Sequence, residues 1–294
     1  MVKCNRFPIL VVIKILKTKL LKHQNMKYPV ILLVSGAVIL SACKKNEKRE
    51  NKSSWLPDVT NSNHGPLKQK QFVGDFDEIE VSQAIEAEII KSDEEKVVIS
   101  APANIIDDVL VDNDGGELHI HYKTGFRVMN TNNVTAKIYT RDFTKLTANS
   151  AATISVKDQF TQDKTDVDVS SSGKVSGKLE ANKFDIDVQS SGTFSGQIWA
   201  VDLSVDTSSA GDVSISGKSK NADFSSSSGA SISGKDLIAE NVKADASSGS
   251  SIEVGVSSQF SASASSGGSI RGFKKGNVTI VSKEESSGGS VTLN

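Results

Sequence analysis

From Asp166 onward, apolar and polar residues alternate in short runs, and serine and glycine separate one run from the next. The runs FDIDV at 184–188, LSVDT at 203–207 and SSIEV at 250–254 carry apolar residues at alternate positions. Alternation over a few residues is the pattern of a strand with one buried face. The second half of the chain is therefore predicted to consist of short β-strands.

A Ser-Ser-Gly unit recurs through this region and gives it a period. Its glycines lie about 19 residues apart, with Ser-Ala-Gly as the third unit, at positions 173, 192, 211, 229, 249, 267 and 288. A flexible Ser/Gly linker would not need Val, Ile, Leu and Phe at repeated places. Short strands between glycine turns, repeated at this length, predict an all-β parallel β-helix in which each coil stacks on the one before.

The repeated glycines are expected to share one corner of the stacked coils, most of them with left-handed backbone angles. Glycine adopts positive φ at little cost, whereas a β-branched residue does not. The serines beside them would form ladders of hydroxyl groups from coil to coil. This arrangement accounts for most of the serine without catalytic chemistry.

The segment that ends at Cys43 has the order of features found in bacterial lipoprotein signals. Lys27 precedes an apolar run from Pro29 to Ala42, and the run ends in Leu-Ser-Ala-Cys. A transmembrane helix, the alternative, needs about 20 apolar residues to cross the hydrocarbon layer, and this run is shorter. The resemblance implies that residues 1–42 are a signal region, with Met26 as an alternative start, and that Cys43 carries lipid.

Residues 43–70 are charged at first and then contain Asn, Ser and Pro, with no sustained apolar period. This composition predicts a tether between the lipidated Cys43 and the folded domain. In the best-studied Gram-negative sorting scheme, an aspartate directly after the cysteine retains a lipoprotein in the inner membrane, and this chain has lysine there. We therefore expect a lipid-anchored protein of the cell envelope, held in the outer membrane.

The first part of the predicted domain, residues 71–150, has longer strands and more charge than the coils that follow. It opens with apolar residues at 72, 76, 79 and 81, has an acidic turn before VVIS at 97–100, and continues with GELHI at 116–120. This order of segments, followed by Ser-Ser-Gly coils, resembles the auto-transporter adhesin head GIN domain family. The resemblance implies a right-handed β-helix over residues 71–294, similar in shape to pectate lyases, with no established catalytic residues.

Composition excludes several classes of function. The formal net charge is −1, which gives no electrostatic reason to expect a nucleic-acid partner. The two cysteines, Cys4 and Cys43, both precede the predicted domain. Neither a disulfide framework nor a cysteine-based zinc site is therefore available within it, and no cofactor is expected.

Two groups of titratable residues raise the question of a metal site. Aspartates recur one coil apart, so the β-helix would stack them in columns that could hold calcium; these are Asp168, Asp187 and Asp206 in one column and Asp166 and Asp185 in another. Aspartate at alternate strand positions is also typical of a solvated outer face, and lysines lie nearby. His119 and His121 share one side of a strand, without a third histidine or cysteine. We favour the solvated face and predict no metal site.

Two functions fit the predicted domain. The first is a non-enzymatic, adhesin-like surface module that presents a polar side to a glycan or protein ligand. The alternative is a carbohydrate-active β-helix of the polysaccharide lyase kind, with carboxylates that hold calcium and a lysine or arginine as base. Trp199 and Arg271 are the notable candidates for sugar contacts, but they lie several coils apart. We therefore predict a binding module and not an enzyme.

The last coil bears on the oligomeric state. A β-helix that ends in mid-coil leaves an open row of backbone groups, which invites pairing with another molecule. The charged sequence SKEE at 282–285 would discourage such stacking. We therefore expect a monomer with a guarded edge, and end-to-end dimerisation is the alternative.

Overall fold

Nearly all regular structure in the described part of the chain is β-strand. The computed structural model describes residues 65–125 and 134–294, and within these ranges the one helix is a short 3₁₀-helix, η1, at Ile106–Asp108. The strands are β1 Leu67–Val73, β2 Glu78–Val81, β3 Glu86–Lys91, β4 Lys96–Pro102, β5 Val109–Asp114, β6 Glu117–Tyr122, β7 Thr135–Thr140, β8 Lys145–Ala148, β9 Thr153–Val156, β10 Phe160–Val169, β11 Lys174–Val188, β12 Thr193–Thr207, β13 Asp212–Ser226, β14 Ser231–Ala246, β15 Ser251–Ala264, β16 Ser269–Lys274, β17 Thr279–Glu285 and β18 Ser290–Leu293. No helix in these ranges is long and apolar enough to cross a bilayer.

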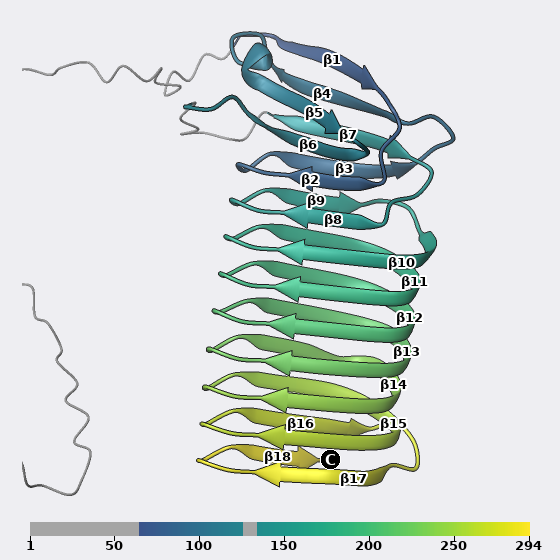
Figure 1. The fold of residues 1–294 in the computed structure, drawn as a ribbon, viewed down its shortest axis with the longest axis vertical. Coiled ribbons are helices and arrows are strands. Elements are labelled where there is room, and N and C mark those ends of the chain that lie inside the picture. The colour runs from purple at the N-terminus through teal and green to yellow at the C-terminus, as the bar shows by residue number, and fades with distance from the viewer. Residues whose placement is uncertain (1–64, 126–133) are drawn as a thin grey trace, which may run out of the picture. The chain divides into compact units, whose positions relative to one another are not determined.

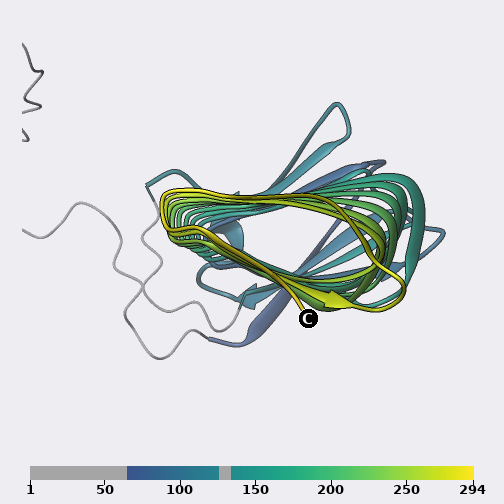
Figure 2. The same cartoon turned by 90° about the horizontal axis from the view of Figure 1, so that it is seen from below.

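The strands from β8 onward form a parallel β-solenoid of about eight turns (Figure 1). Each coil hydrogen-bonds in parallel to the next, and Lys174 of β11 pairs with Thr193 of β12, one repeat further along the chain. The chain winds in a right-handed sense as it passes down the stack (Figures 1 and 2). The predicted right-handed parallel β-helix with coils of about 19 residues is confirmed.

Each coil is flattened, with a narrow end and a broad end (Figure 2). The narrow end is the Ser-Ser-Gly turn that follows each strand. In β11 the inward residues Val175, Leu179 and Phe184 are buried, whereas Asn182 and Lys183 are two consecutive exposed residues. Two exposed residues in a row interrupt the strand alternation and turn the chain. We call this bend and its equivalents in the other coils the broad corner.

The glycines of the Ser-Ser-Gly units share the narrow end, but they form two columns and not one. Gly229, Gly249, Gly267 and Gly288 have φ between +70° and +79°, as expected. Gly173, Gly192 and Gly211 lie one position later in the turn, and the left-handed position before each is held by Ser172, Ser191 and Ala210. Four of the seven glycines therefore have left-handed angles, as expected for most of them, and these three do not.

Lack of space, and not positive φ, explains glycine at position 192. A Cβ atom there would lie 2.6 Å from the backbone carbonyl oxygen of Val169 in the coil before. Contacts this short force the neighbouring backbone to move. Glycine at this point of the turn therefore lets two coils approach closely.

Gly192→Val is expected to lower the free energy of unfolding by about 1–3 kcal/mol, because the added side chain overpacks the turn. Urea denaturation followed by circular dichroism measures this change. Ser195→Ala, an exposed change in the same coil, is the control and should leave the midpoint nearly unchanged. Equal midpoints for Gly192→Val and wild type would contradict the close approach of the coils.

The N-terminal end of the solenoid is closed by strands that do not follow the coil order. Strand β4 pairs antiparallel with both β1 and β7, and β5 pairs antiparallel with β6. The coil made by β2 and β3 lies between the β6–β7 coil and the β8–β9 coil, so the chain inserts its first coil between two later ones. These antiparallel strands cover the backbone edge of the first parallel coils. Strand β1 begins at Leu67, so Leu67–Lys70 of the expected tether belong to the sheet.

We call the antiparallel strands β1 and β4 to β7 the cap. A buried carboxylate stabilises it. Glu95, whose side chain is 6% exposed, accepts a hydrogen bond of 3.0 Å from the backbone N–H of Phe76 and contacts the Arg141 guanidinium at 3.1 Å. The hydrogen bond to Glu95 raises the pKa of Arg141 further above its ordinary value. A buried charge needs such partners, because burial without them is costly. The contacts join the segment before β2, the start of β4 and the end of β7.

The last coil is more exposed than those before it. Strand β17 pairs with β15, and within the described residues it has no partner on its other side. Its apolar residues Ile280 and Val281 are more than half exposed, and they precede Lys283, Glu284 and Glu285. The charged residues 282–285 lie on this edge strand, as the sequence predicts. The monomeric state stays a prediction.

Candidate functional site

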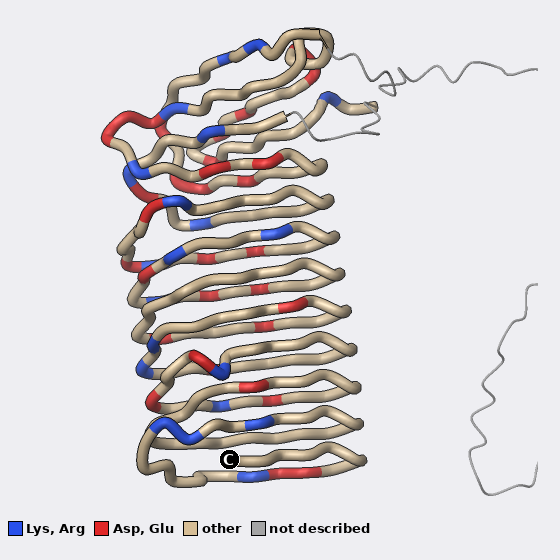
Figure 3. Tube along the Cα trace, turned by 180° about the vertical axis from the view of Figure 1, so that it is seen from behind, with Lys and Arg blue, Asp and Glu red and all other residues tan. Residues whose placement is uncertain are grey.

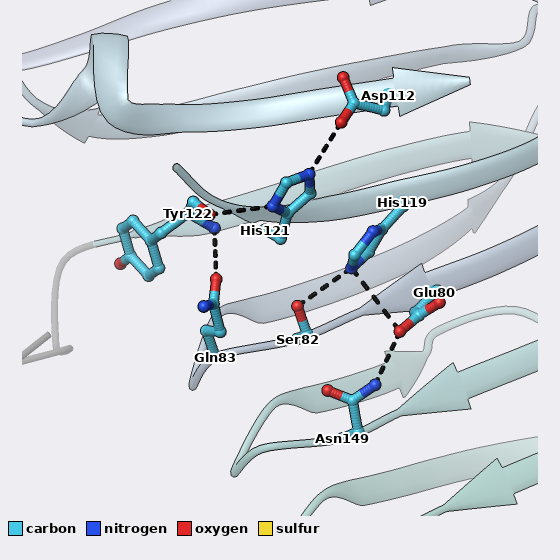
Figure 4. A network of polar contacts seen from close by, with 8 residues as sticks. All are labelled: Glu80, Ser82, Gln83, Asp112, His119, His121, Tyr122 and Asn149. Atoms are coloured by element: carbon cyan, nitrogen blue, oxygen red, sulfur yellow. Dashed lines mark hydrogen bonds and ion pairs between the residues drawn. The ribbon is translucent and has the colours of Figure 1, made fainter. Parts of the chain in front are cut away.

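A polar network lies where the cap meets the solenoid (Figure 4). Strand β6 presents His119 and His121 on one side, as the alternation predicts, and their rings stack with centroids 4.2 Å apart and planes inclined by 21°. Neighbouring strands supply the hydrogen-bond partners, which include Glu80, Ser82 and Asp112.

His121 is held at both ring nitrogens. Its Nδ1 lies 2.9 Å from the carbonyl oxygen of Tyr122, and its Nε2 lies 2.8 Å from Oδ2 of Asp112. A carbonyl oxygen and a carboxylate only accept, so both contacts are satisfied when both nitrogens carry hydrogen. These contacts fix the ring of His121 and join β6 to β5.

His119 contacts two oxygens through one nitrogen. Its Nε2 lies 3.1 Å from Oγ of Ser82 and 3.6 Å from Oε1 of Glu80. Asn149 fixes that carboxylate by donating to Oε1 of Glu80 at 2.7 Å. A catalytic triad needs the acid on one nitrogen and the serine on the other. Since both oxygens share Nε2 and Ser82 is buried, this geometry orients side chains and does not activate a nucleophile.

Burial lowers the pKa of His119 below its ordinary value of 6.5, and His121 lowers it further. The carboxylates of Glu80, Asp112 and Glu117 oppose this shift and do not overcome it. The folded protein therefore favours the neutral imidazole. The unfolded chain takes up a proton at higher pH than the folded one, so this contribution to stability is complete above about pH 6.5 and decreases as the pH falls through the folded pKa.

We expect the urea midpoint of the wild type to fall more steeply than that of His119→Gln between about pH 8 and about pH 5. Glutamine keeps a hydrogen-bonding side chain beside Ser82 and cannot titrate. Parallel urea titrations at several pH values measure both slopes. Identical slopes in the two proteins would show that His119 does not contribute to the pH dependence of folding.

The aspartate columns exist as predicted. Asp168, Asp187 and Asp206 are paired one above another in successive coils, and Asp166 pairs with Asp185. Burial first, and then the neighbouring carboxylates of Asp168 and Asp206, raise the pKa of Asp187.

Lysines accompany these columns. Lys145 lies 3.0 Å from Asp168, Lys183 lies 2.9 Å from Asp185, and Lys164 contacts Asp166. Acidic and basic positions are accordingly interleaved along the coils (Figure 3). Over residues 65–125 and 134–294, no three His, Cys, Asp or Glu side chains gather around a point that could hold a metal ion. The columns therefore have the character of a salt-bridged outer face.

A groove of about 600 Å³ runs along the broad corner from β11 to β17, and we call it the corner groove. One of its walls is a ladder of stacked side chains. Asn221 donates to Oδ1 of Asp202 at 2.7 Å, and Asn241 donates to Oδ1 of Asn221 at 2.9 Å. Lys183 precedes and Gln259 follows these residues in the same column. We call Asp202, Asn221 and Asn241 the amide ladder.

Trp199 lies at the upper end of this surface. Its side chain is 45% exposed and lines a second groove of about 570 Å³ together with Asp163, Lys164 and Asn182. Asn182 donates to Asp163 at 3.0 Å, and the next residue, Lys183, lines the corner groove. The two grooves are therefore adjacent on the broad corner.

Trp199 was predicted from the sequence as a candidate for sugar contacts, whereas the amide ladder was not predicted. Aligning the chain at the 19-residue repeat would have placed Asp202, Asn221 and Asn241 one above another. Arg271, the other notable residue, lies in β16 and pairs with Glu253 at 2.6 Å. It is not among the residues that line either groove. Cys43 and the signal region lie outside the described residues.

Neighbouring carboxylates fix the charge of the lysines in the corner groove. The hydrogen bond to Asp185 raises the pKa of Lys183. Hydrogen bonds to Asp223 and Asp245, each at 3.3 Å, raise the pKa of Lys243. Both lysines are therefore held as cations.

The family of the chain follows from comparison with known sequences. A sequence model described as "Putative auto-transporter adhesin, head GIN domain" matches residues 75–197 and 175–276, which together make up more than half of the chain. The chain belongs to this family. The head GIN family assignment confirms the resemblance seen in the order of segments. A search of curated proteins found no match.

Solved structures support the same fold for this head GIN domain protein. A putative adhesin from Parabacteroides merdae matches with a TM-score of 0.71 and 18% identity, over 78% of this chain and 95% of that chain. A putative adhesin from Parabacteroides distasonis matches with a TM-score of 0.70 and 20% identity, over 78% and 98%. A putative lipid binding protein from the same species matches with a TM-score of 0.60 and 19% identity, over 78% and 97%. At these identities the likeness establishes the fold.

Proposed function

We propose that this head GIN domain protein is a lipid-anchored, non-enzymatic, adhesin-like module of the cell envelope. Its solenoid presents the broad corner to a ligand, a glycan or a protein, and its lipid holds it at the outer membrane. Membership in a family of adhesin head domains supports a location at the cell surface or envelope. The lipoprotein signal before Cys43 supports the anchor.

The ion pairs of the groove lysines support the non-enzymatic part, because Lys183 lies 2.9 Å from Asp185 and Lys243 lies 3.3 Å from Asp223 and from Asp245. A polysaccharide lyase needs a base that can take a proton from the sugar ring, and a lysine serves only in its neutral form. Carboxylates raise the pKa of Lys183 and Lys243, which is the opposite of the shift that a base requires. The same contacts make these lysines suitable as fixed hydrogen-bond donors to a bound molecule.

The connection between anchor and solenoid also favours a binding role. The chain enters the described domain at β1, which belongs to the cap. The corner groove begins at β11 and continues to β17, so it lies on the coils beyond the cap. An attachment at the capped end therefore leaves the groove accessible. Parallel ladders hold the groove side chains on a rigid frame.

Cys43→Ser is expected to move the protein from the membrane fraction to the soluble fraction, because serine cannot form the thioether that carries the lipid. Cell fractionation with immunoblotting measures the distribution, and mass spectrometry of the wild type should find acyl groups on Cys43. Cys4→Ser is the matched control and should leave the protein on membranes. A Cys43→Ser variant that stays on membranes, with a wild type that carries no acyl group, would overturn the anchor.

A further inference from the structure

We propose that the ligand of the corner groove is a linear, neutral polysaccharide that lies along the solenoid axis with one sugar ring against Trp199. This inference rests on the proposed function, because it assumes a binding module.

The amide ladder offers paired donors and acceptors in a fixed direction. Asp202 can only accept, so it orients Asn221, which in turn orients Asn241. After these bonds are made, Asn221 keeps one N–H hydrogen and one lone pair of its Oδ1 unused by the ladder. Adjacent hydroxyl groups of a sugar can donate to one of these atoms and accept from the other. The ladder thus matches a polyhydroxylated ligand.

The remaining lining suits the apolar faces of sugar rings. Leu203, Ala222 and Val242 line the corner groove with little exposed surface, and Val281 of β17, which is 62% exposed, adds an apolar side chain to it. At the upper end, the half-exposed Trp199 offers an aromatic face beside Asn182. A pyranose ring presents C–H bonds on its faces and hydroxyl groups at its edge. An aromatic face with amides beside it is complementary to both parts.

The charges of the groove select against acidic chains. Three aspartates and two lysines line the corner groove, namely Asp185, Asp202, Asp223, Lys183 and Lys243. The Trp199 groove adds Asp77, Asp142 and Asp163 against Lys164. Both lysines of the corner groove already pair with aspartates. In the corner groove a uronate or sulfate would therefore meet three aspartates and two lysines that already pair with aspartates, whereas a neutral sugar carries no charge to be repelled.

The repeat of the groove favours a polymer over a single sugar. Parallel pairing places equivalent side chains about 4.8 Å apart from coil to coil. The lining of the corner groove comes from β11, β12, β13, β14, β15 and β17, so similar polar groups recur along its length. A linear chain of sugars can use several rungs at once, and each added ring increases the affinity.

The test measures binding of neutral hexasaccharides to the full-length protein in a detergent without a sugar headgroup. The probes are cellohexaose, mannohexaose, xylohexaose and laminarihexaose, with hexagalacturonate as the acidic comparison. Trp55→Phe leaves Trp199 as the single tryptophan, because the chain has two, so its fluorescence reports on the groove. At least one neutral hexasaccharide should change this fluorescence saturably, and its disaccharide should bind at least about tenfold more weakly.

Substitutions test whether the hexasaccharide binds in the groove, and calorimetry measures the affinity of each variant. Trp199→Ala should weaken binding at least about tenfold, equivalent to ~1.4 kcal/mol. Ile238→Ala is its control, because Ile238 is exposed in the same register column two coils away. Asn221→Ala should weaken binding about threefold or more. Its control, Ser214→Ala, is an exposed change in the same strand.

Three results would overturn the proposal: no neutral hexasaccharide binds, hexagalacturonate binds as well as they do, or Trp199→Ala binds as wild type does. If the protein is still anchored and does not degrade the probes, these results would rule out a neutral polysaccharide as the ligand. They would not contradict the proposed function. Cleavage of a bound hexasaccharide, detected by mass spectrometry, would instead contradict the non-enzymatic role. The two failures are therefore distinguishable.

Discussion

The parallel backbone ladder is the constraint on which the structure depends. Each coil satisfies its N–H and C=O groups with the coils on either side, so a residue type that suits one position must suit the same position in the next coil. This requirement produces the buried apolar columns inside and repeated polar columns outside. It also turns a property of one coil, such as an amide at the broad corner, into a surface that extends along the molecule.

The same constraint explains how like charges can be stacked. Asp168, Asp187 and Asp206 lie one above another, and burial first, then the two neighbouring carboxylates, raise the pKa of Asp187. Lysines such as Lys145 pair with individual carboxylates. The columns of aspartates are therefore a consequence of the register between coils. Ion pairs with lysines, within a coil and between coils, limit the repulsion among the carboxylates. At the broad corner, asparagines in place of further aspartates avoid repulsion and add hydrogen bonds.

The repeat made the coils predictable, but not the features that depend on single coils. Alternation and the Ser-Ser-Gly period identified the solenoid, because both are imposed by stacking. Between Gly211 and Gly229 the glycine moves by one position within the turn. This change could not be predicted, because serine and alanine occupy the left-handed position in the earlier turns. The cap has no period, so neither its strand order nor the buried Glu95 contact was evident. Aligning the repeat already places Asp202, Asn221 and Asn241 in one column, and the structure adds the hydrogen bonds between them.

The inserted first coil has a consequence for how the protein acquires its structure. Glu78 of β2 pairs with Glu117 of β6 on one side and with Lys145 of β8 on the other. A coil that emerges first cannot complete its hydrogen bonds until both later segments are available. Long sequence separation between partners slows folding, whereas the regular coils pair with near neighbours in the chain. The N-terminal end is therefore expected to close after the regular coils have paired, so the capped end of the solenoid would be the last part to become rigid.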